Sequence, residues 1–171
     1  MALPSSPAPA LTLRPAGPGD APLLFTLFRC TRVAEASRWG WVGDQLTEFL
    51  DTQWQMEQRM HRTRYPEADD AIVLADGEPV GRLLVDRTNG RIFLVDLTLL
   101  PKARGKGIGT RLVRDLLVEA EFDGLPLRLS VPRGSRALGL LRRVGLEVVT
   151  ASELTVGMAF SPASPLVSAT G

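Results

Sequence analysis

The first half of the chain contains two segments in which apolar residues recur every three or four positions, the spacing of one helix face. The first runs from about Asp20 toward Ala34. The second begins near Asp44, fades near His61 and ends at Pro66 at the latest. Asp20 and Asp44 both occur where an N-cap is needed. We therefore predict two helices, separated by a break at residues 37–43.

Three strand-like runs follow these helices, at residues 71–75, 79–87 and 91–101. An Asp-Gly pair (76–77) separates the first two, and an Asn-Gly pair (89–90) separates the second and third. These dipeptides suit tight turns with positive φ and are the strongest short-range signals for a β-hairpin. The pattern predicts an antiparallel three-stranded meander.

The rest of the chain alternates helical and strand-like patterns. A helix begins near Ile108, and further elements are expected at 11–17 (strand), 126–131 (strand), 135–144 (helix) and 154–160 (strand), with an additional short strand at 146–149. This order predicts a mixed α/β fold built around one central sheet.

Length and composition indicate one domain, since 171 residues with 44% hydrophobic and 23% charged residues are globular values. We expect it to span residues 11–160, after a disordered Pro/Ala-rich lead-in at 1–10 and before a flexible tail at 161–171. The N-terminus lacks the basic and apolar regions of a signal peptide, and no apolar run approaches membrane-spanning length. We expect a cytoplasmic protein that does not associate with membranes. The net charge of +1 argues against nucleic acid as a partner.

Cysteine and histidine each occur once, as Cys30 and His61. The single cysteine excludes an intramolecular disulfide and a cysteine-based zinc site. The single histidine removes most other metal-site and Ser-His-Asp interpretations. We expect no metal site. A buried, inert thiol is the default interpretation of Cys30, and a surface position is the default for His61.

A glycine-rich stretch, "PKARGKGIGT" (101–110), joins the last strand of the meander to the next helix. A helix start presents unpaired N–H groups and partial positive charge, and glycine lets an anion approach the backbone closely. Arg104, Lys106 and Arg111 add positive charge. The stretch matches neither the phosphate loop of the P-loop NTPases nor the Rossmann fingerprint. It therefore predicts a phosphate site of another kind.

The segment "LTLLPKARGKGIGTRLVRDLLVEA" resembles the signature region of the GNAT superfamily of acyl-CoA-dependent acyltransferases. Arg104, Gly107 and Gly109 fill the family pattern [RQ]-x-x-G-x-[GA] after a strand. "LTLRPAGPGDAPLL" and "SVPRGSRALGLLRRVGLEVV" extend the resemblance over nearly the whole domain. It implies a mixed, mostly antiparallel central sheet of six to seven strands, with the fourth and fifth strands splayed and about four helices on its faces.

The resemblance also implies an activity, which is transfer of an acetyl group from acetyl-CoA to a primary amine by direct attack in a ternary complex. The backbone of four strand residues would pair with the pantetheine arm: Leu97, Thr98, Leu99 and Leu100. The backbone N–H groups of the turn would hold the pyrophosphate: Arg104, Gly105, Lys106, Gly107, Ile108, Gly109 and Thr110. The amide of Leu99 or Leu100 would polarise the thioester carbonyl.

Many family members protonate the leaving thiolate with a tyrosine in the pattern N-x-x-A-x-x-[LIV]-Y-x-x-x-G-F. Here Ala137, Leu140 and Gly145 fit, but Leu141 occupies the tyrosine position, and Gly134 and Leu146 replace the asparagine and phenylalanine. Leucine cannot donate a proton. The acid then comes from elsewhere, water supplies the proton, or efficient catalysis has been lost.

Asp96 is our candidate general base because it is the lone carboxylate in the apolar strand before the turn, on the face of Thr98 and Leu100. An ordinary cross-strand or surface charge is the alternative. Tyr65 is a further candidate acid, with a packing role as its alternative. Three tryptophans could line an acceptor pocket or simply pack: Trp39, Trp41 and Trp54. Three arginines could steer an anionic substrate or be solvated: Arg59, Arg62 and Arg64.

Two functions remain open from the sequence. The first is an acetyl-CoA-dependent N-acetyltransferase whose partners are acetyl-CoA and an amine, either a small molecule or a peptide. The second is an acyl-CoA-binding module with little or no catalysis, which Leu141 favours. A homodimer is compatible with either function.

Overall fold

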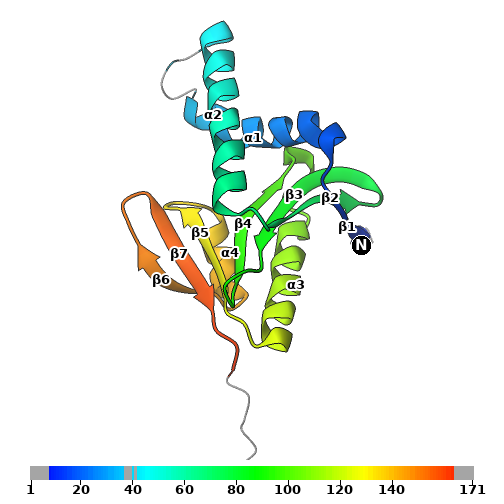
Figure 1. Ribbon diagram of the computed structural model, residues 1–171, viewed down its shortest axis with the longest axis vertical. Coiled ribbons are helices and arrows are strands. Elements are labelled where there is room, and N and C mark those ends of the chain that lie inside the picture. The colour runs from blue at the N-terminus through cyan, green and yellow to red at the C-terminus, as the bar shows by residue number, and fades with distance from the viewer. Residues whose placement is uncertain (1–7, 37–39, 41, 164–171) are drawn as a thin grey trace, which may run out of the picture.

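The computed structural model describes residues 8–36, 40 and 42–163, with the backbone alone for 34–36. Seven strands form one sheet in the order β1-β2-β3-β4-β5-β7-β6 (Figure 1). The strands are β1 (Leu11–Pro15), β2 (Asp69–Ala75), β3 (Glu78–Asp86), β4 (Ile92–Leu99), β5 (Leu127–Pro132), β6 (Glu147–Ala151) and β7 (Thr155–Phe160). The helices are α1 (Ala21–Ala36), α2 (Gly43–Arg64), α3 (Ile108–Asp123) and α4 (Ala137–Arg143).

The predicted meander is confirmed as the antiparallel strands β2, β3 and β4. Asp76 (φ 51°) and Asn89 (φ 57°) adopt the left-handed conformation that these hairpin turns need, each followed by a glycine with positive φ. The strand predicted at 146–149 is also present, as β6 on the edge of the sheet.

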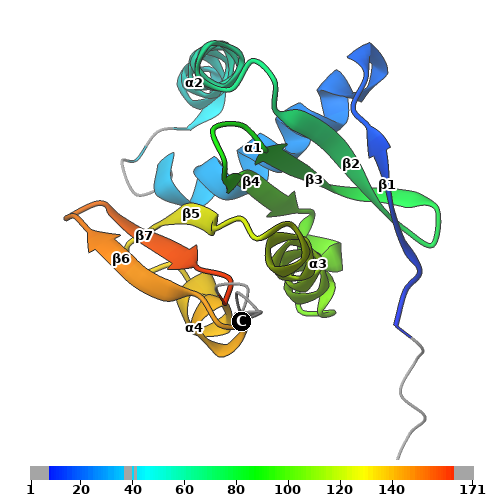
Figure 2. The ribbon, with the colours of Figure 1, turned by 60° about the horizontal axis from the view of Figure 1, so that its bottom comes forward.

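Two helices cover each face of the sheet (Figure 2). The larger core lies beneath α3, whose apolar stripe is fully buried against β3, β4 and β5. A smaller cluster joins α1 and α2 to the other face, through Leu24, Leu27 and Ile72 with Trp54 packed against them. The sheet therefore separates a side bearing α3 and α4 from a side bearing α1 and α2.

The parallel strands β4 and β5 pair over only three residues, from Ile92–Leu127 to Leu94–Leu129. Beyond that point β4 continues to Leu99 and β5 to Pro132 without pairing to each other. The predicted architecture is thereby confirmed: a mixed, mostly antiparallel sheet with splayed fourth and fifth strands and four helices.

The predicted cap at Asp44 is wrong, and the carboxylate of Asp20 binds residues that precede its helix. Asp20 ends a 3₁₀ turn (Pro18–Asp20), where its carboxylate accepts hydrogen bonds from the Gly17 N–H (2.8 Å) and from Arg14 (2.7 Å). The helix α1 begins only after this turn. Val42 is the N-cap of α2, so that Asp44 lies inside the first turn.

Among the described residues, no helix is both long enough and apolar enough to span a bilayer.

Candidate active site

The glycine-rich turn ends β4 and starts α3 through two left-handed glycines, Gly105 (φ 73°) and Gly107 (φ 77°). Gly107 is the N-cap of α3, and no side chain caps the helix there. Buried Ile108 anchors the first turn in the core. The free N–H groups of a 16-residue helix are consequently directed toward solvent at this end, an arrangement that favours an anion.

The conformation and surroundings of Gly109 show whether the fold itself requires a glycine at this position. Its φ is not positive, and a Cβ atom added there would meet only Leu99 Cδ1, at an ordinary 3.9 Å. The fold therefore has no need of glycine at this position. A small residue here leaves room beside the backbone, where a longer side chain would exclude a bound phosphate.

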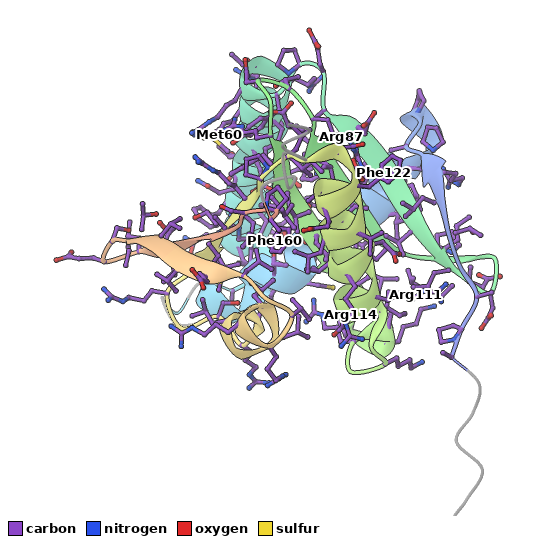
Figure 3. All side chains as sticks on the ribbon, turned by 90° about the horizontal axis from the view of Figure 1, so that it is seen from below. Met60, Arg87, Arg111, Arg114, Phe122 and Phe160 are labelled. Carbon is purple, nitrogen blue, oxygen red and sulfur yellow. The ribbon has the colours of Figure 1, made fainter. Side chains whose placement is uncertain are left out.

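Arginine side chains surround the turn in different ways. Arg104 Nε donates to the carbonyl of Leu99 (2.9 Å), which ties the turn back to the end of β4. Arg111 donates to the carbonyl of Pro9 (3.3 Å). Figure 3 shows Arg111 and Arg114 projecting from the part of α3 nearest the turn. Positive charge therefore flanks the free end of the helix.

The divergence of β4 and β5 opens a cavity of about 450 Å³, here called the β4–β5 slot. Its walls are mostly apolar and come from both strands, α3 and α4. Gly109 and Arg104 lie at its end near the turn, and Asp96 lines its wall on β4. The slot thus runs from the glycine-rich turn into the sheet.

Along this slot, the backbone N–H groups of β4 differ in the side of the strand toward which they are directed. The N–H of Leu100 donates to the carbonyl of Val80 on the β3 side (2.8 Å). Because consecutive strand residues direct their N–H groups to opposite edges, the N–H of Leu99 faces the open slot. Of the two amides expected to polarise a carbonyl, only that of Leu99 is directed into the slot.

A second cavity, of about 250 Å³, lies between the sheet, α1 and α2, and is here called the α1–α2 cavity. Thr31, Asp96 and Pro132 line both this cavity and the slot. The two spaces therefore meet at Asp96, through the gap between the splayed strands.

Asp96 has two polar neighbours. Thr98 Oγ1 donates to Asp96 Oδ1 (2.8 Å), and Arg82 Nη1 lies 3.7 Å from Oδ2. Burial raises the pKa of Asp96 above the ordinary aspartate value, and the Thr98 hydrogen bond and the Arg82 charge oppose the rise. A carboxylate of raised pKa at the junction of two cavities is suited to accepting a proton.

The sequence interpretation missed the partner of Asp96. Arg82 is only 4% exposed, and Asp70 holds it with two hydrogen bonds of 2.8 and 2.7 Å. The available signal was an arginine inside the apolar run of β3. Such a charge requires a partner when it is buried.

The tyrosine position of the family pattern is filled as expected. Leu141 is 3% exposed, belongs to the core beneath α3 and lines the slot, where it has no proton to donate. The hydroxyls along the slot belong to Thr31, Ser130 and Ser135. Thr31 donates to the Phe28 carbonyl (2.7 Å).

The other singled-out residues lie around α2. Tyr65 caps the helix and stacks on Phe93, with ring centroids 5.7 Å apart. The expectation of a surface position for His61 is wrong, because it is half-buried, its Nδ1 is enclosed without a partner, and burial lowers its pKa. Trp54 packs on Phe28, at 5.4 Å between centroids.

The remaining expectations concern Cys30, two of the tryptophans and a metal site. Cys30 is half-buried and unpaired on α1. Trp39 and Trp41 lie outside the described residues. Within the part of the chain that the structure describes, no cluster of three or more His, Cys, Asp or Glu side chains could hold a metal ion.

Comparison with known folds gives consistent matches. PaiA N-acetyltransferase of Thermoplasma acidophilum, solved with coenzyme A, superposes with a TM-score of 0.65 at 17% identity, covering 89% of this chain and 99% of that one. An acetyltransferase of Thermus thermophilus gives 0.62 at 20% identity, with 90% and 98% coverage. A GNAT family acetyltransferase of Elizabethkingia anophelis with acetyl-CoA bound gives 0.56 at 13% identity, with 88% and 97% coverage. These likenesses establish the fold alone.

Sequence comparison supplies the family. No curated protein matches the chain significantly. The family model described as acetyltransferase (GNAT) family matches residues 31–146, about two thirds of the chain, including the turn, both splayed strands and Asp96. The chain therefore belongs to the GNAT acetyltransferase family.

Proposed function

We propose that this protein is an acetyl-CoA-dependent N-acetyltransferase that acts on a primary amine by direct attack. The observation that carries the proposal is the meeting of two cavities at Asp96. One leads to the anion-binding turn, and the other opens on the opposite side of the sheet. A donor and an acceptor can therefore approach one carboxylate from two sides.

The residues of the turn and the slot fit acetyl-CoA, which supplies the activated acetyl thioester. The N–H groups from Gly105 to Thr110 bind the pyrophosphate, and Gly109 leaves the space for it. The predicted contribution of the Arg104 N–H is not available, because this group donates to the carbonyl of Pro101 (3.2 Å). The unpaired edge of β4 from Leu97 to Leu100 binds the amide-bearing arm as a neighbouring strand would. The N–H of Leu99 then polarises the thioester carbonyl.

Asp96 removes a proton from the incoming ammonium group. An alkylamine with a pKa near 10.4 is deprotonated at pH 7 at a cost of about 4.6 kcal/mol, so a positioned base is valuable. The leaving thiolate has a pKa of about 8.5, and water suffices to protonate it. Leu141 therefore slows the reaction without preventing it.

The first prediction is tested by thermal unfolding with acetyl-CoA. At 100 times its dissociation constant the ligand adds about 2.7 kcal/mol and raises the midpoint by roughly 5–10 °C. Gly109→Glu should lose most of this shift, because a carboxylate there would occupy the phosphate's space and repel it, while the ligand-free midpoint should stay close to that of the parent, since an added Cβ has room. An equal shift in both proteins would place the ligand away from the turn.

A matched control is Gly139→Glu on α4, where an added Cβ would meet only Arg143 Nη1 at 3.7 Å. Gly139 is helical and does not line the slot, so this variant should keep the full shift. Gly107 is a poorer choice because its left-handed φ of 77° strains any other residue.

The buried Leu141 favours one rival, an acyl-CoA-binding module with little catalysis. Amine-dependent release of the CoA thiol separates the two functions. Thiol release with any primary amine, lost in Asp96→Asn, supports the enzyme. A full thermal shift with no release across a panel of amines would support the module.

A further inference from the structure

The α1–α2 cavity has a distinctive charge balance. Arg82 is paired with Asp70 and approached by Asp96, and Arg32 Nη2 pairs with Glu57 Oε2 (3.1 Å). The cavity wall itself contains two guanidinium groups, Arg32 and Arg82, and two carboxylates, Glu57 and Asp96, so it has no surplus positive charge when Asp96 is ionised. Both arginines already have carboxylate partners, so an anionic ligand would compete with built ion pairs.

The rest of the cavity wall is apolar. Leu24, Leu27, Phe28 and Trp54 complete the lining, and the two aromatic rings are in contact. The body of a ligand whose polar end lies beside Asp96 would therefore contact aliphatic and aromatic surface. Such a division suits a molecule with one charged end and an apolar remainder.

The size of the cavity sets a limit as well. Its volume is about 250 Å³, below the range usual for drug-sized ligands. A small amine fits this volume, and Leu24, Trp54 and Arg82 also line a neighbouring cavity of about 570 Å³.

We propose that the acceptor is a small primary alkyl- or arylalkylamine whose ammonium group is its only charge, and that the α1–α2 cavity discriminates against the corresponding amino acid. This inference rests on the proposed N-acetyltransferase function. The ammonium group binds beside Asp96, and the apolar body contacts Trp54 and Phe28. A carboxylate on the adjacent carbon is disfavoured because it would approach Glu57 and Asp96, while both arginines of the cavity already have carboxylate partners.

The test is a matched acceptor series with the purified protein and saturating acetyl-CoA. 2-Phenylethylamine, phenylalaninamide and phenylalanine share a ring and differ at one carbon, which bears hydrogen, a neutral amide or a carboxylate. We expect kcat/KM for phenylalanine to be at least about tenfold below that for the other two. The pair 3-methylbutylamine and leucine should repeat this order with an aliphatic body.

Two variants locate the discrimination. Glu57→Gln removes one carboxylate from the cavity and should reduce the preference for amine over amino acid by roughly two- to fivefold, since the ion pair is partly exposed. Trp54→Phe should raise KM for the apolar amines with little change in the acetyl-CoA thermal shift. Met56→Ala, on the exposed side of the same helix, should change neither quantity.

The outcomes separate the two proposals. No turnover with any amine and no acetyl-CoA shift would overturn the proposed function itself. Turnover with phenylalanine as good as with 2-phenylethylamine would overturn only the acceptor class, as would a free peptide N-terminus that outcompetes every small amine. An unchanged preference in Glu57→Gln, with normal folding, would also contradict the charge argument.

Discussion

Asp96 illustrates how one side chain acquires its properties from neighbours on several elements. Arg82 on β3 and Thr98 on its own strand stabilise the charged form, while burial opposes it. Glu57 on α2 raises the pKa further, and half-buried His61 lowers it. The bidentate Asp70–Arg82 pair keeps the guanidinium directed mainly at Asp70, so Asp96 is only partly neutralised.

This arrangement predicts opposite pH effects for two conservative variants. Asp70→Asn leaves Arg82 with Asp96 as its remaining carboxylate, which should lower the pKa of Asp96 and move the acidic limb of kcat/KM to lower pH. Thr98→Val removes a hydrogen bond to the charged form and should move the limb to higher pH. The measurement is kcat/KM from about pH 5 to 9 for both variants.

Asp96→Asn is the reference for these profiles. This variant should abolish the acidic limb of the pH profile and reduce kcat/KM by roughly 10²- to 10⁴-fold, the usual contribution of a general base. Shifts of the same sign in Asp70→Asn and Thr98→Val would show that Asp96 is not the titrating group. Thermal midpoints of all three variants control for loss of folding.

At the scale of single elements, β4 shows where sequence patterns stop being informative. Its pairing with β3 passes from Leu84–Asp96 to Val85–Leu94, so Val95 has no partner and forms a bulge. Strict alternation of side chains would place Leu94 on the same face of the sheet as Asp96. Because of the bulge, Leu94 instead faces the core beneath α3, as Leu97 does. A bulge depends on the partner strand, and no local signal in "RIFLVDLTLLP" indicates it.

The local features of the same region were predictable. The glycines of the turn and the Asp-Gly and Asn-Gly hairpins depend on φ preferences that a residue carries with it. Asp20 was misassigned because a 3₁₀ turn precedes α1, and the carboxylate then binds Gly17 and Arg14 in place of a helix N-terminus. Non-local partners, such as Asp70 for Arg82, were beyond pattern reasoning.

The Asp20 connection makes a prediction about acid stability. Its hydrogen bonds from Arg14 and Gly17 lower its pKa to about 2, below the value of about 3.9 in an unfolded chain. The stabilisation is therefore complete above the unfolded value and is lost as pH falls through about 2. Asp20→Asn should be less stable than the parent near neutral pH, and the difference should vanish in acid.

Denaturant midpoints from about pH 2 to 6 measure this difference. A constant gap across the range would mean that packing around the turn, rather than the carboxylate charge, accounts for the loss.

At the scale of the whole molecule, the sheet separates the two binding regions that we propose. The glycine-rich turn belongs to the side with α3, whereas α1 and α2, which line the α1–α2 cavity, cover the other side (Figure 2). The spaces meet where β4 and β5 part. Donor and acceptor can be bound together, with no need for a protein nucleophile between them.

This division predicts sequential kinetics. Initial-rate lines at varied amine and acetyl-CoA should intersect, and no acetylated protein should be detected by mass when the amine is omitted. Cys30, the sole cysteine, does not line the slot, so Cys30→Ala should show unchanged rates. Parallel lines, or a stable acetyl adduct lost in Cys30→Ala, would contradict direct attack.

The three-residue pairing of β4 with β5 has one more consequence. A sheet normally leaves unpaired backbone only along its two outer strands, but here the interior of the sheet contains an edge of its own. Another protein chain could not easily reach that edge, because helices cover both faces of the sheet around it. A slender ligand carrying amide groups could reach it and complete the sheet as a temporary strand. The unpaired backbone groups where β4 and β5 diverge are thus available to a slender ligand, while the surrounding fold keeps them from pairing with another protein molecule.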